Sequence, residues 1–123
     1  MIEKKLESIQ LNLEGHNKQF KDMTPSEIIL WGYENFDNHF AITTSFGIQS
    51  SVILHMVHQC SLQKKIKIFW IDTGYLPSET YKYADRLIND LSLNIEVLQS
   101  DLSPARMESL YGKLWETNKS SDL

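Results

Sequence analysis

The sequence predicts an α/β protein with a mostly parallel β-sheet, and two observations lead to this prediction. Short segments rich in β-branched and aromatic residues alternate with longer segments in which apolar residues recur at helical spacing. The joints between these segments are short, and strands linked through helices in this way run parallel with right-handed crossovers. We therefore expect a three-layer protein in which helices pack on the faces of a three-stranded sheet.

Two N-terminal helices are expected before the sheet. Apolar residues at helical spacing predict the first, from Met1 to about Leu13, and a break at 15–17 ends the pattern. Thr24 suits the N-cap of the second helix, and Pro25 suits its first helical position. The apolar residues of this helix that we expect to cover the rest of the chain are Ile28, Leu30, Trp31 and Phe36.

Strands and helices then alternate along the chain. Strands are expected at 39–43, 66–71 and 94–98, where β-branched and aromatic residues gather. Helices are expected from about Ile48 to Cys60 and from Pro77 or Ser78 to about Leu91. In the first of these helices, the stripe expected to be buried is Ile48, Val52, Met56 and Cys60.

Composition excludes several classes of protein. The chain of 123 residues has 12 basic and 16 acidic side chains, and its net charge of -4 argues against a general nucleic-acid binder. A single cysteine, Cys60, excludes an internal disulfide, a cysteine-rich zinc site and an iron–sulfur cluster built from this chain alone. The sequence contains no run of about 20 apolar residues and no apolar signal segment. We therefore expect a cytoplasmic protein without a membrane partner.

Two loops are the candidate functional sites because ligands of parallel α/β sheets bind at the carboxyl ends of the strands. The loop at 43–49 offers Gly47, several hydroxyl groups and the positive end of a helix dipole, which suit a phosphate or sulfate group. In the loop at 72–79, Asp72 can accept hydrogen bonds from a ligand. Each loop also has a purely structural interpretation: a serine caps the helix in the first, and the aspartate caps nearby amides in the second.

The order of residues in these loops carries a family resemblance. The first loop resembles the phosphate loop of the adenine-nucleotide alpha-hydrolase-like superfamily and reads Ser45-Phe46-Gly47-Ile48-Gln49-Ser50. Its Ser-Phe-Gly-Ile-Gln form looks like that of the 3'-phosphoadenylyl-sulfate (PAPS) reductase family. The second loop matches a signature of the same family with Asp72-Thr73-Gly74. Further matching stretches are Glu79-Thr80-Tyr81 and Tyr111-Gly112-Lys113-Leu114-Trp115-Glu116.

The resemblance extends from about Asn17 to Glu116 and implies a Rossmann-like adenine-nucleotide alpha-hydrolase fold. It implies a helical segment at 1–38 and an incomplete nucleotide-binding domain at 39–123, with PAPS or adenosine 3',5'-bisphosphate bound by both loops. Family members use thioredoxin as the electron donor, without a bound cofactor, to reduce PAPS to sulfite in assimilatory sulfate reduction. The related adenylyl-sulfate reductases usually have an acidic phosphate loop, so Gln49 favours PAPS as the substrate.

The resemblance also implies that this chain lacks the group that attacks sulfur. Family members continue into an arginine-rich segment and a Glu-Cys-Gly motif, whose cysteine attacks the sulfonate sulfur. Cys60 stands at the end of a helix, where the dipole disfavours a thiolate, so we expect a packing residue there and no catalytic residue in the chain. His55 and His58 share a helical face without a further ligand, so we expect no metal site.

Three functional hypotheses follow. The first is a member of the PAPS reductase family that by itself lacks the sulfur-attacking step. The second is a truncated module that binds an adenine nucleotide, as half of a split protein with a complementing chain or as a homodimer. The third is an ATP pyrophosphatase-type adenylating enzyme, and the presence of Gln49 in place of an acidic residue argues against it.

Overall fold

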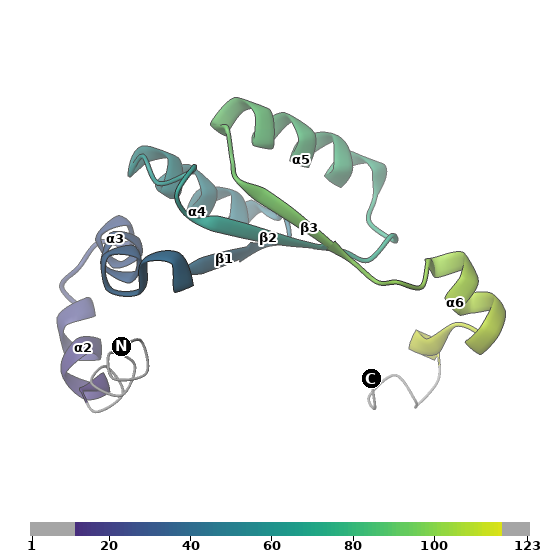
Figure 1. Cartoon of the computed structure of the whole chain (residues 1–123), viewed down its shortest axis with the longest axis horizontal. Coiled ribbons are helices and arrows are strands. Elements are labelled where there is room, and N and C mark those ends of the chain that lie inside the picture. The colour runs from purple at the N-terminus through teal and green to yellow at the C-terminus, as the bar shows by residue number, and fades with distance from the viewer. Residues whose placement is uncertain (1–11, 117–123) are drawn as a thin grey trace.

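A parallel three-stranded sheet forms the centre of the molecule, as predicted. The computed structural model describes residues 12–116. Its strands are β1 (Ala41–Thr44), β2 (Lys67–Asp72) and β3 (Ile95–Gln99), and each overlaps the segment predicted for it. They pair in the order β1-β2-β3, and both pairs are parallel (Figure 1). The predicted α/β class is therefore confirmed.

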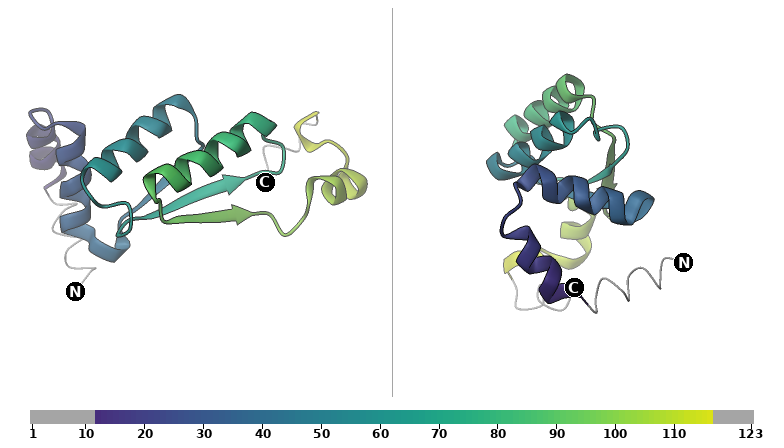
Figure 2. Two further views of the ribbon diagram at one scale, coloured as in Figure 1. Left: turned by 90° about the horizontal axis from the view of Figure 1, so that it is seen from above. Right: turned by 90° about the vertical axis from the view of Figure 1, so that its left-hand side faces the viewer.

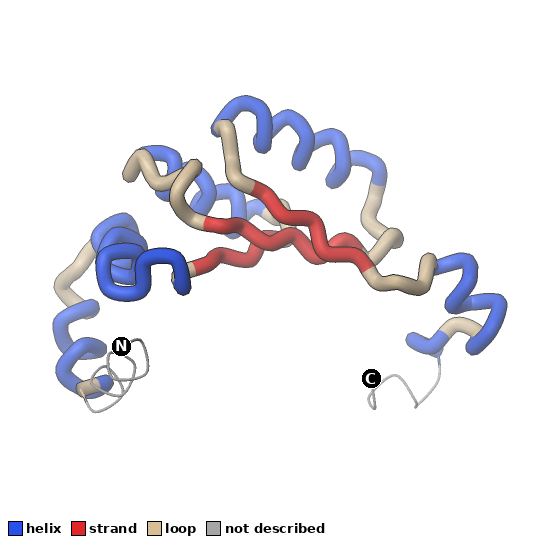
Figure 3. Tube along the Cα trace, viewed as in Figure 1, coloured by secondary structure: helices blue, strands red, loops and turns tan. Residues whose placement is uncertain are grey.

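Helices α4 (Ile48–Gln59) and α5 (Ser78–Leu91) lie side by side on one face of the sheet (Figure 2). Each links one strand to the next, and two right-handed crossovers that step in the same direction place both helices on the same face. The described residues thus supply the sheet and one helical layer of the expected three-layer arrangement (Figure 3). On the other face, the side chains of Ile71 and Leu98 are 62% and 41% exposed.

Helices α2 (Leu13–Phe20) and α3 (Pro25–Phe36) precede the sheet, at the end where the strands begin. Thr24 caps α3 as predicted, because its Oγ1 accepts a hydrogen bond from the Glu27 amide at 3.3 Å. The Glu27 carboxylate in turn accepts from the Thr24 amide at 2.6 Å, which completes a capping box.

The predicted break at 15–17 is wrong because these residues lie inside α2. His16 stacks on Phe20 one turn later, with ring centroids 6.4 Å apart, and both rings contact Trp31 of α3. These ring contacts stabilise a continuous helix and offset the low helix propensity of glycine. Most of the helix predicted from Met1 to Leu13 lies outside the described residues.

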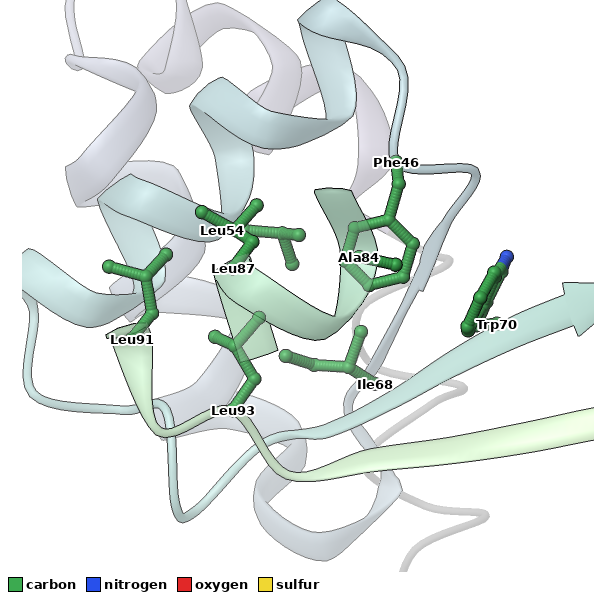
Figure 4. Packing of buried hydrophobic residues seen from close by; sticks show 8 residues of the cluster. All are labelled: Phe46, Leu54, Ile68, Trp70, Ala84, Leu87, Leu91 and Leu93. Carbon is green, nitrogen blue, oxygen red and sulfur yellow. The ribbon is translucent and has the colours of Figure 1, made fainter. Parts of the chain in front are cut away.

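Two clusters of buried side chains form the core. Figure 4 shows the larger one, in which Ile68 and Trp70 of β2 pack against Leu54 of α4 and Leu87 of α5. The smaller cluster consists of Val57, Leu62 and Ile66. The side chains of α3 that pack against it are Ile29 and Tyr33.

The stripe that was predicted to be buried on α4 is wrong. Ile48 is 90% exposed and Val52 is 50% exposed, whereas Leu54 and Val57 are fully buried and Ser51 is nearly so. Apolar residues surround almost the whole helix, so their spacing does not select one face. Docking against β2 and α5 selects the face that is buried. The remaining members of the predicted stripe are half-buried: Met56 and Cys60.

Helix α6 (Pro104–Tyr111) lies beyond the carboxyl end of the sheet, and no pattern in the sequence had indicated it. The Ser103 hydroxyl caps it by accepting from the Arg106 amide at 3.2 Å. Two short 3-10 helices complete the described elements: η1 (Asp37–His39) and η2 (Leu114–Glu116). Among the described residues, no helix combines the length and the apolar character needed to cross a membrane.

Candidate functional site

The first loop comprises residues 45–47, which connect β1 to α4 at the carboxyl end of the sheet, together with residues 48–50, which begin that helix. Gly47 is the N-cap of α4, and no side chain within the described chain caps this helix. The first amides of a 12-residue helix therefore remain free to donate, at the positive end of its dipole. A hollow of about 350 Å³, the first hollow, is lined by Ser45, Gly47, Ile48, Gln49 and Ser50.

Hydroxyl groups of the first loop hydrogen-bond within the loop. Ser45 Oγ lies 3.2 Å from Ser50 Oγ and accepts from the Gly47 amide at 3.4 Å. The structural interpretation, in which Ser45 merely caps the helix, does not match this geometry because Gly47 occupies the N-cap position. Neutral donors and a helix N-terminus together suit a tetrahedral anion.

Phe46 anchors the first loop to the sheet through its buried side chain and does not line the first hollow. Its side chain is only 4% exposed and packs edge-on against Trp70, with ring centroids 4.9 Å apart. Its φ of 56° lies in the left-handed region, which is costly for a residue other than glycine. Its amide donates to Thr44 Oγ1 at 3.1 Å. Burial of the ring offsets the backbone cost, and only the backbone of Phe46 is left to face a ligand.

The Asp72 carboxylate joins three elements at the end of β2. Its Oδ1 accepts from the Tyr81 hydroxyl of α5 at 2.6 Å and from the Gly74 amide of its own loop at 2.9 Å. Its Oδ2 accepts from Gln99 Nε2 of β3 at 2.9 Å. A carboxylate offers about four acceptor positions, so about one remains for a ligand. Asp72 therefore caps the Gly74 amide, as the structural interpretation expects, and also has an acceptor position left for a ligand.

These hydrogen bonds keep the carboxylate ionised. The bond from Tyr81, followed by those from Gly74 and Gln99, holds the pKa of Asp72 below its ordinary value. The same bond to the carboxylate, helped by desolvation and by the charge of Asp72, raises the pKa of Tyr81. The second loop therefore presents a negative charge near neutral pH.

A second hollow of about 230 Å³ opens beside this carboxylate. The residues that line it are Asp72, Thr73, Gly74, Gln99, Ser100, Asp101, Leu102, Ser103 and Pro104. One wall is the loop after β2 and the other is the loop after β3, and the Asp72–Gln99 hydrogen bond spans the two. The outer end of the hollow is formed by the start of α6, because Gly74 packs closely against Pro104.

Tyr75 ties α6 to the second loop. Its hydroxyl donates to Glu108 Oε1 at 2.6 Å, and its ring meets Trp115 edge-on with centroids 5.0 Å apart. Desolvation of the phenol, together with the hydrogen bond and charge of Glu108, raises the pKa of Tyr75 to about 12. The loop itself is closed by a hydrogen bond from the Tyr75 amide to Thr73 Oγ1 at 3.2 Å.

Neither Gln99 of β3 nor Tyr81 of α5 was predicted as a site residue, although Tyr81 belongs to the matching stretch at 79–81. Gln99 ends β3 at the same edge as the two predicted loops, so the rule that selected those loops would also have selected this residue. Tyr81 lies nine residues after Asp72, and only the packing of α5 against the sheet brings its hydroxyl to the carboxylate.

The remaining candidates lie away from both hollows. Cys60 is half-buried at the far end of α4, where its Sγ donates to the Ser26 carbonyl oxygen at 3.9 Å. His55 Nδ1 lies 2.7 Å from the Ser51 carbonyl oxygen, and His58 Nδ1 lies 3.2 Å from that of Leu91. Within residues 12–116, no group of three or more His, Cys, Asp and Glu side chains is arranged to hold a metal ion.

Comparison with known proteins connects this arrangement to a family. The model of the phosphoadenosine phosphosulfate reductase domain matches residues 39–123. A phosphoadenosine 5'-phosphosulfate reductase of Synechococcus sp. is 49% identical over 106 residues, which are 86% of this chain and 45% of that protein. The reductase of the same name from Salmonella schwarzengrund is 42% identical over 106 residues, which are 86% of this chain and 43% of that protein.

A solved structure supports the fold. The crystal structure of a PAPS reductase from Candida auris, a phosphate complex, matches with a TM-score of 0.77 and 24% identity. The match covers 91% of this chain and 55% of that one. The chain spans less than half the length of the curated relatives named above. Since the domain model matches residues 39–123, well over half of the sequence, the chain belongs to the phosphoadenosine phosphosulfate reductase family.

Proposed function

We propose that this chain binds PAPS or its product adenosine 3',5'-bisphosphate, as the nucleotide-binding part of a PAPS reductase. One observation carries the proposal: two hollows of different electrostatic character lie at the same edge of the sheet. Neutral hydroxyl and amide donors line the first hollow, and an ionised carboxylate lies in the second. Both ligands carry anionic groups on the 3' and 5' positions of the ribose and have one neutral part, the adenine base.

The charges favour one orientation of the nucleotide. Phosphate and sulfate groups bind in the first hollow, where the amides that begin α4 donate to them. Asp72 and Asp101 repel them from the second hollow, which suits the neutral adenine base with its hydrogen-bonding groups. The binding residues proposed are Ser45, Gly47, Ile48, Gln49 and Ser50 with the backbone of Phe46, and Asp72, Thr73 and Gly74.

We assign the binding step, and not the reduction, to the residues of this chain. We propose thioredoxin as the electron donor, sulfite as the product and the cytoplasm as the location of the complete reductase. The one thiol here is Cys60, which lies at the opposite end of α4 from the first loop. No thiol of this chain is therefore placed to attack a sulfonate bound at the first loop.

The free side of β1 supports the proposal that a partner strand completes the sheet. Among the described strands β1 pairs only with β2, so its other side presents backbone groups without a strand partner. A complementing chain, or a second copy of this one, would supply the missing strand. Analytical ultracentrifugation of the full chain tests this: a monodisperse monomer would exclude the homodimer.

Titration calorimetry with adenosine 3',5'-bisphosphate tests the binding proposal. We expect saturable heat with the folded chain and much weaker binding of unphosphorylated adenosine. Replacing Ser50 with Ala removes a hydroxyl from the first hollow and should weaken binding, whereas the control Ser109→Ala, on α6, should leave it unchanged. Absence of heat at high ligand concentration, with circular dichroism showing a folded chain, would contradict nucleotide binding.

Two enzymatic assays separate the alternatives. With PAPS and reduced thioredoxin, we expect no sustained release of sulfite from the 123-residue chain alone. Sustained turnover that disappears in Cys60→Ser would show that this thiol is catalytic. With ATP and magnesium, release of pyrophosphate would support an adenylating enzyme instead.

A further inference from the structure

Three aromatic rings run from the first loop to the second along the helix-facing side of the sheet. Phe46 packs edge-on against Trp70 at 4.9 Å, and Trp70 packs against Tyr81 at 5.9 Å between ring centroids. Figure 4 shows the first two of these rings, one from the loop and one from β2. Trp70 is 7% exposed and Phe46 is 4% exposed, so this contact is part of the core.

The third ring ends in a hydrogen bond to the second loop. The Tyr81 hydroxyl donates to Asp72 Oδ1 at 2.6 Å, and the same oxygen accepts from the Gly74 amide. Tyr81 is not among the residues that line either hollow. Its ring nevertheless contacts Trp70, which packs against Phe46 of the first loop, and its hydroxyl contacts Asp72 at the start of the second loop.

We infer that Tyr81 is a positioning residue that couples the two loops of the nucleotide site. Through Trp70 its ring supports Phe46, and its hydroxyl fixes the Asp72 carboxylate between β2, β3 and the loop. The inference rests on the proposed function, because the ligand that spans both loops is a nucleotide.

The backbone of both loops explains why such a coupling is useful. Phe46 holds a left-handed conformation (φ 56°) and Gly74 another (φ 78°), so both loops leave the extended and helical states, and the conformation is costly for Phe46. A ligand that must order both loops itself would bind more weakly, because ordering costs conformational entropy. A side chain that holds both loops in place before the nucleotide binds reduces this entropy cost of binding.

The first test removes only the hydroxyl. Tyr81→Phe keeps the ring contact with Trp70 and deletes the hydrogen bond to Asp72. We expect the pKa of Asp72, followed by its side-chain carbon resonance, to rise, and binding of adenosine 3',5'-bisphosphate to weaken roughly three- to tenfold. The other groups that hydrogen-bond this carboxylate remain in place, the Gly74 amide and Gln99 Nε2, and Asp101 still lines the same hollow.

The second test removes the ring. Tyr81→Leu should also disturb the first loop, so the amide resonance of Gly47 should shift, and its response to inorganic sulfate should weaken. Tyr81→Phe should leave that response unchanged. The matched control is Tyr83→Phe on the same helix, where the side chain is 37% exposed, and it should change none of these readouts.

A double-mutant cycle shows whether Tyr81 acts through the carboxylate. In the Asp72→Ala background, Tyr81→Phe should cause no further loss of nucleotide binding. An additive loss would overturn the inference, as would an Asp72 pKa that Tyr81→Phe leaves unchanged. If the wild-type chain binds no nucleotide, the proposed function fails, while the Asp72 titration and the Gly47 resonance still decide the coupling between the loops.

Discussion

Replacing Gly74 with Ala should destabilise the second loop and displace the start of α6. A Cβ built on Gly74 would lie 2.6 Å from Pro104 Cγ and 3.0 Å from Pro104 Cδ. The pyrrolidine ring cannot rotate away as a flexible side chain does, so the overlap is relieved only by moving α6. The φ of 78° adds a second cost, because side-chain-bearing residues disfavour this region.

The expected loss of stability combines these two costs with one smaller gain. The left-handed conformation costs an alanine about 1 to 2 kcal/mol, and overpacking of this kind costs about 1 to 3 kcal/mol. The lower backbone entropy of unfolded alanine returns about 0.4 to 1 kcal/mol. We therefore expect Gly74→Ala to lower the free energy of unfolding by about 1 to 5 kcal/mol, the combined range of these contributions.

Urea unfolding followed by circular dichroism measures this change, and two further variants separate its causes. Gly112→Ala has a similar φ of 73° but no atom within 4 Å of the new Cβ, so it reports a backbone cost without overlap. Adding Pro104→Ala to Gly74→Ala removes the overlapping carbons and should recover about 1 to 3 kcal/mol. If Gly74→Ala lowers the free energy of unfolding equally with proline and with alanine at position 104, overlap with the proline ring is not a cause of the loss.

Leu54 is fully buried, so Leu54→Ala should lower the free energy of unfolding by about 2 to 5 kcal/mol. Val52 is 50% exposed, so Val52→Ala should change it by less than about 0.5 kcal/mol, and equal costs in urea unfolding would contradict the buried face of α4. Because its folded pKa is lowered, Asp72 should stabilise the fold above about pH 4, and this contribution should disappear as the pH falls through the folded value. Unfolding midpoints at stepped pH should show a slope that Asp72→Asn reduces. Because the pKa of Tyr75 is raised to about 12, its contribution should be present below about pH 10 and be lost as the pH rises towards 12. Tyrosinate absorbance should reveal this late titration in the wild type, and Tyr75→Phe should reduce its amplitude and leave the part that Tyr81 contributes.

The elements with strong local signals were predictable from the sequence. Strand β2 has a run of β-branched and aromatic residues. Helix α5 begins after Pro77 and ends at Leu91, the boundary predicted for it. The capping box at Thr24 depends only on residues within one turn of the chain. In each case the information is local, so packing with distant residues does not need to be known.

The orientation of α4 and the stability of α2 were not predictable in this way. Apolar residues occupy several faces of α4, and two contacts choose the buried face: Leu54 packs in the cluster with β2 and α5, and Val57 packs in the cluster that contacts α3. Helix α2 continues through Gly15 because His16 and Phe20 meet the ring of Trp31, a contact between two helices. Both outcomes depend on residues far apart in the sequence.

For the site, the α/β class, the parallel strands and the two loops at their carboxyl ends follow from patterns along the chain. Strand polarity and connection length alone place Gly47 and Asp72 at one edge. The use of the loop side chains follows from long-range packing, which buries Phe46 beneath the first loop and brings Tyr81 and Gln99 to the Asp72 carboxylate. A hydrogen bond or a ring contact requires placement within a few tenths of an ångström, and the packing of α5 and β3 against β2 provides it.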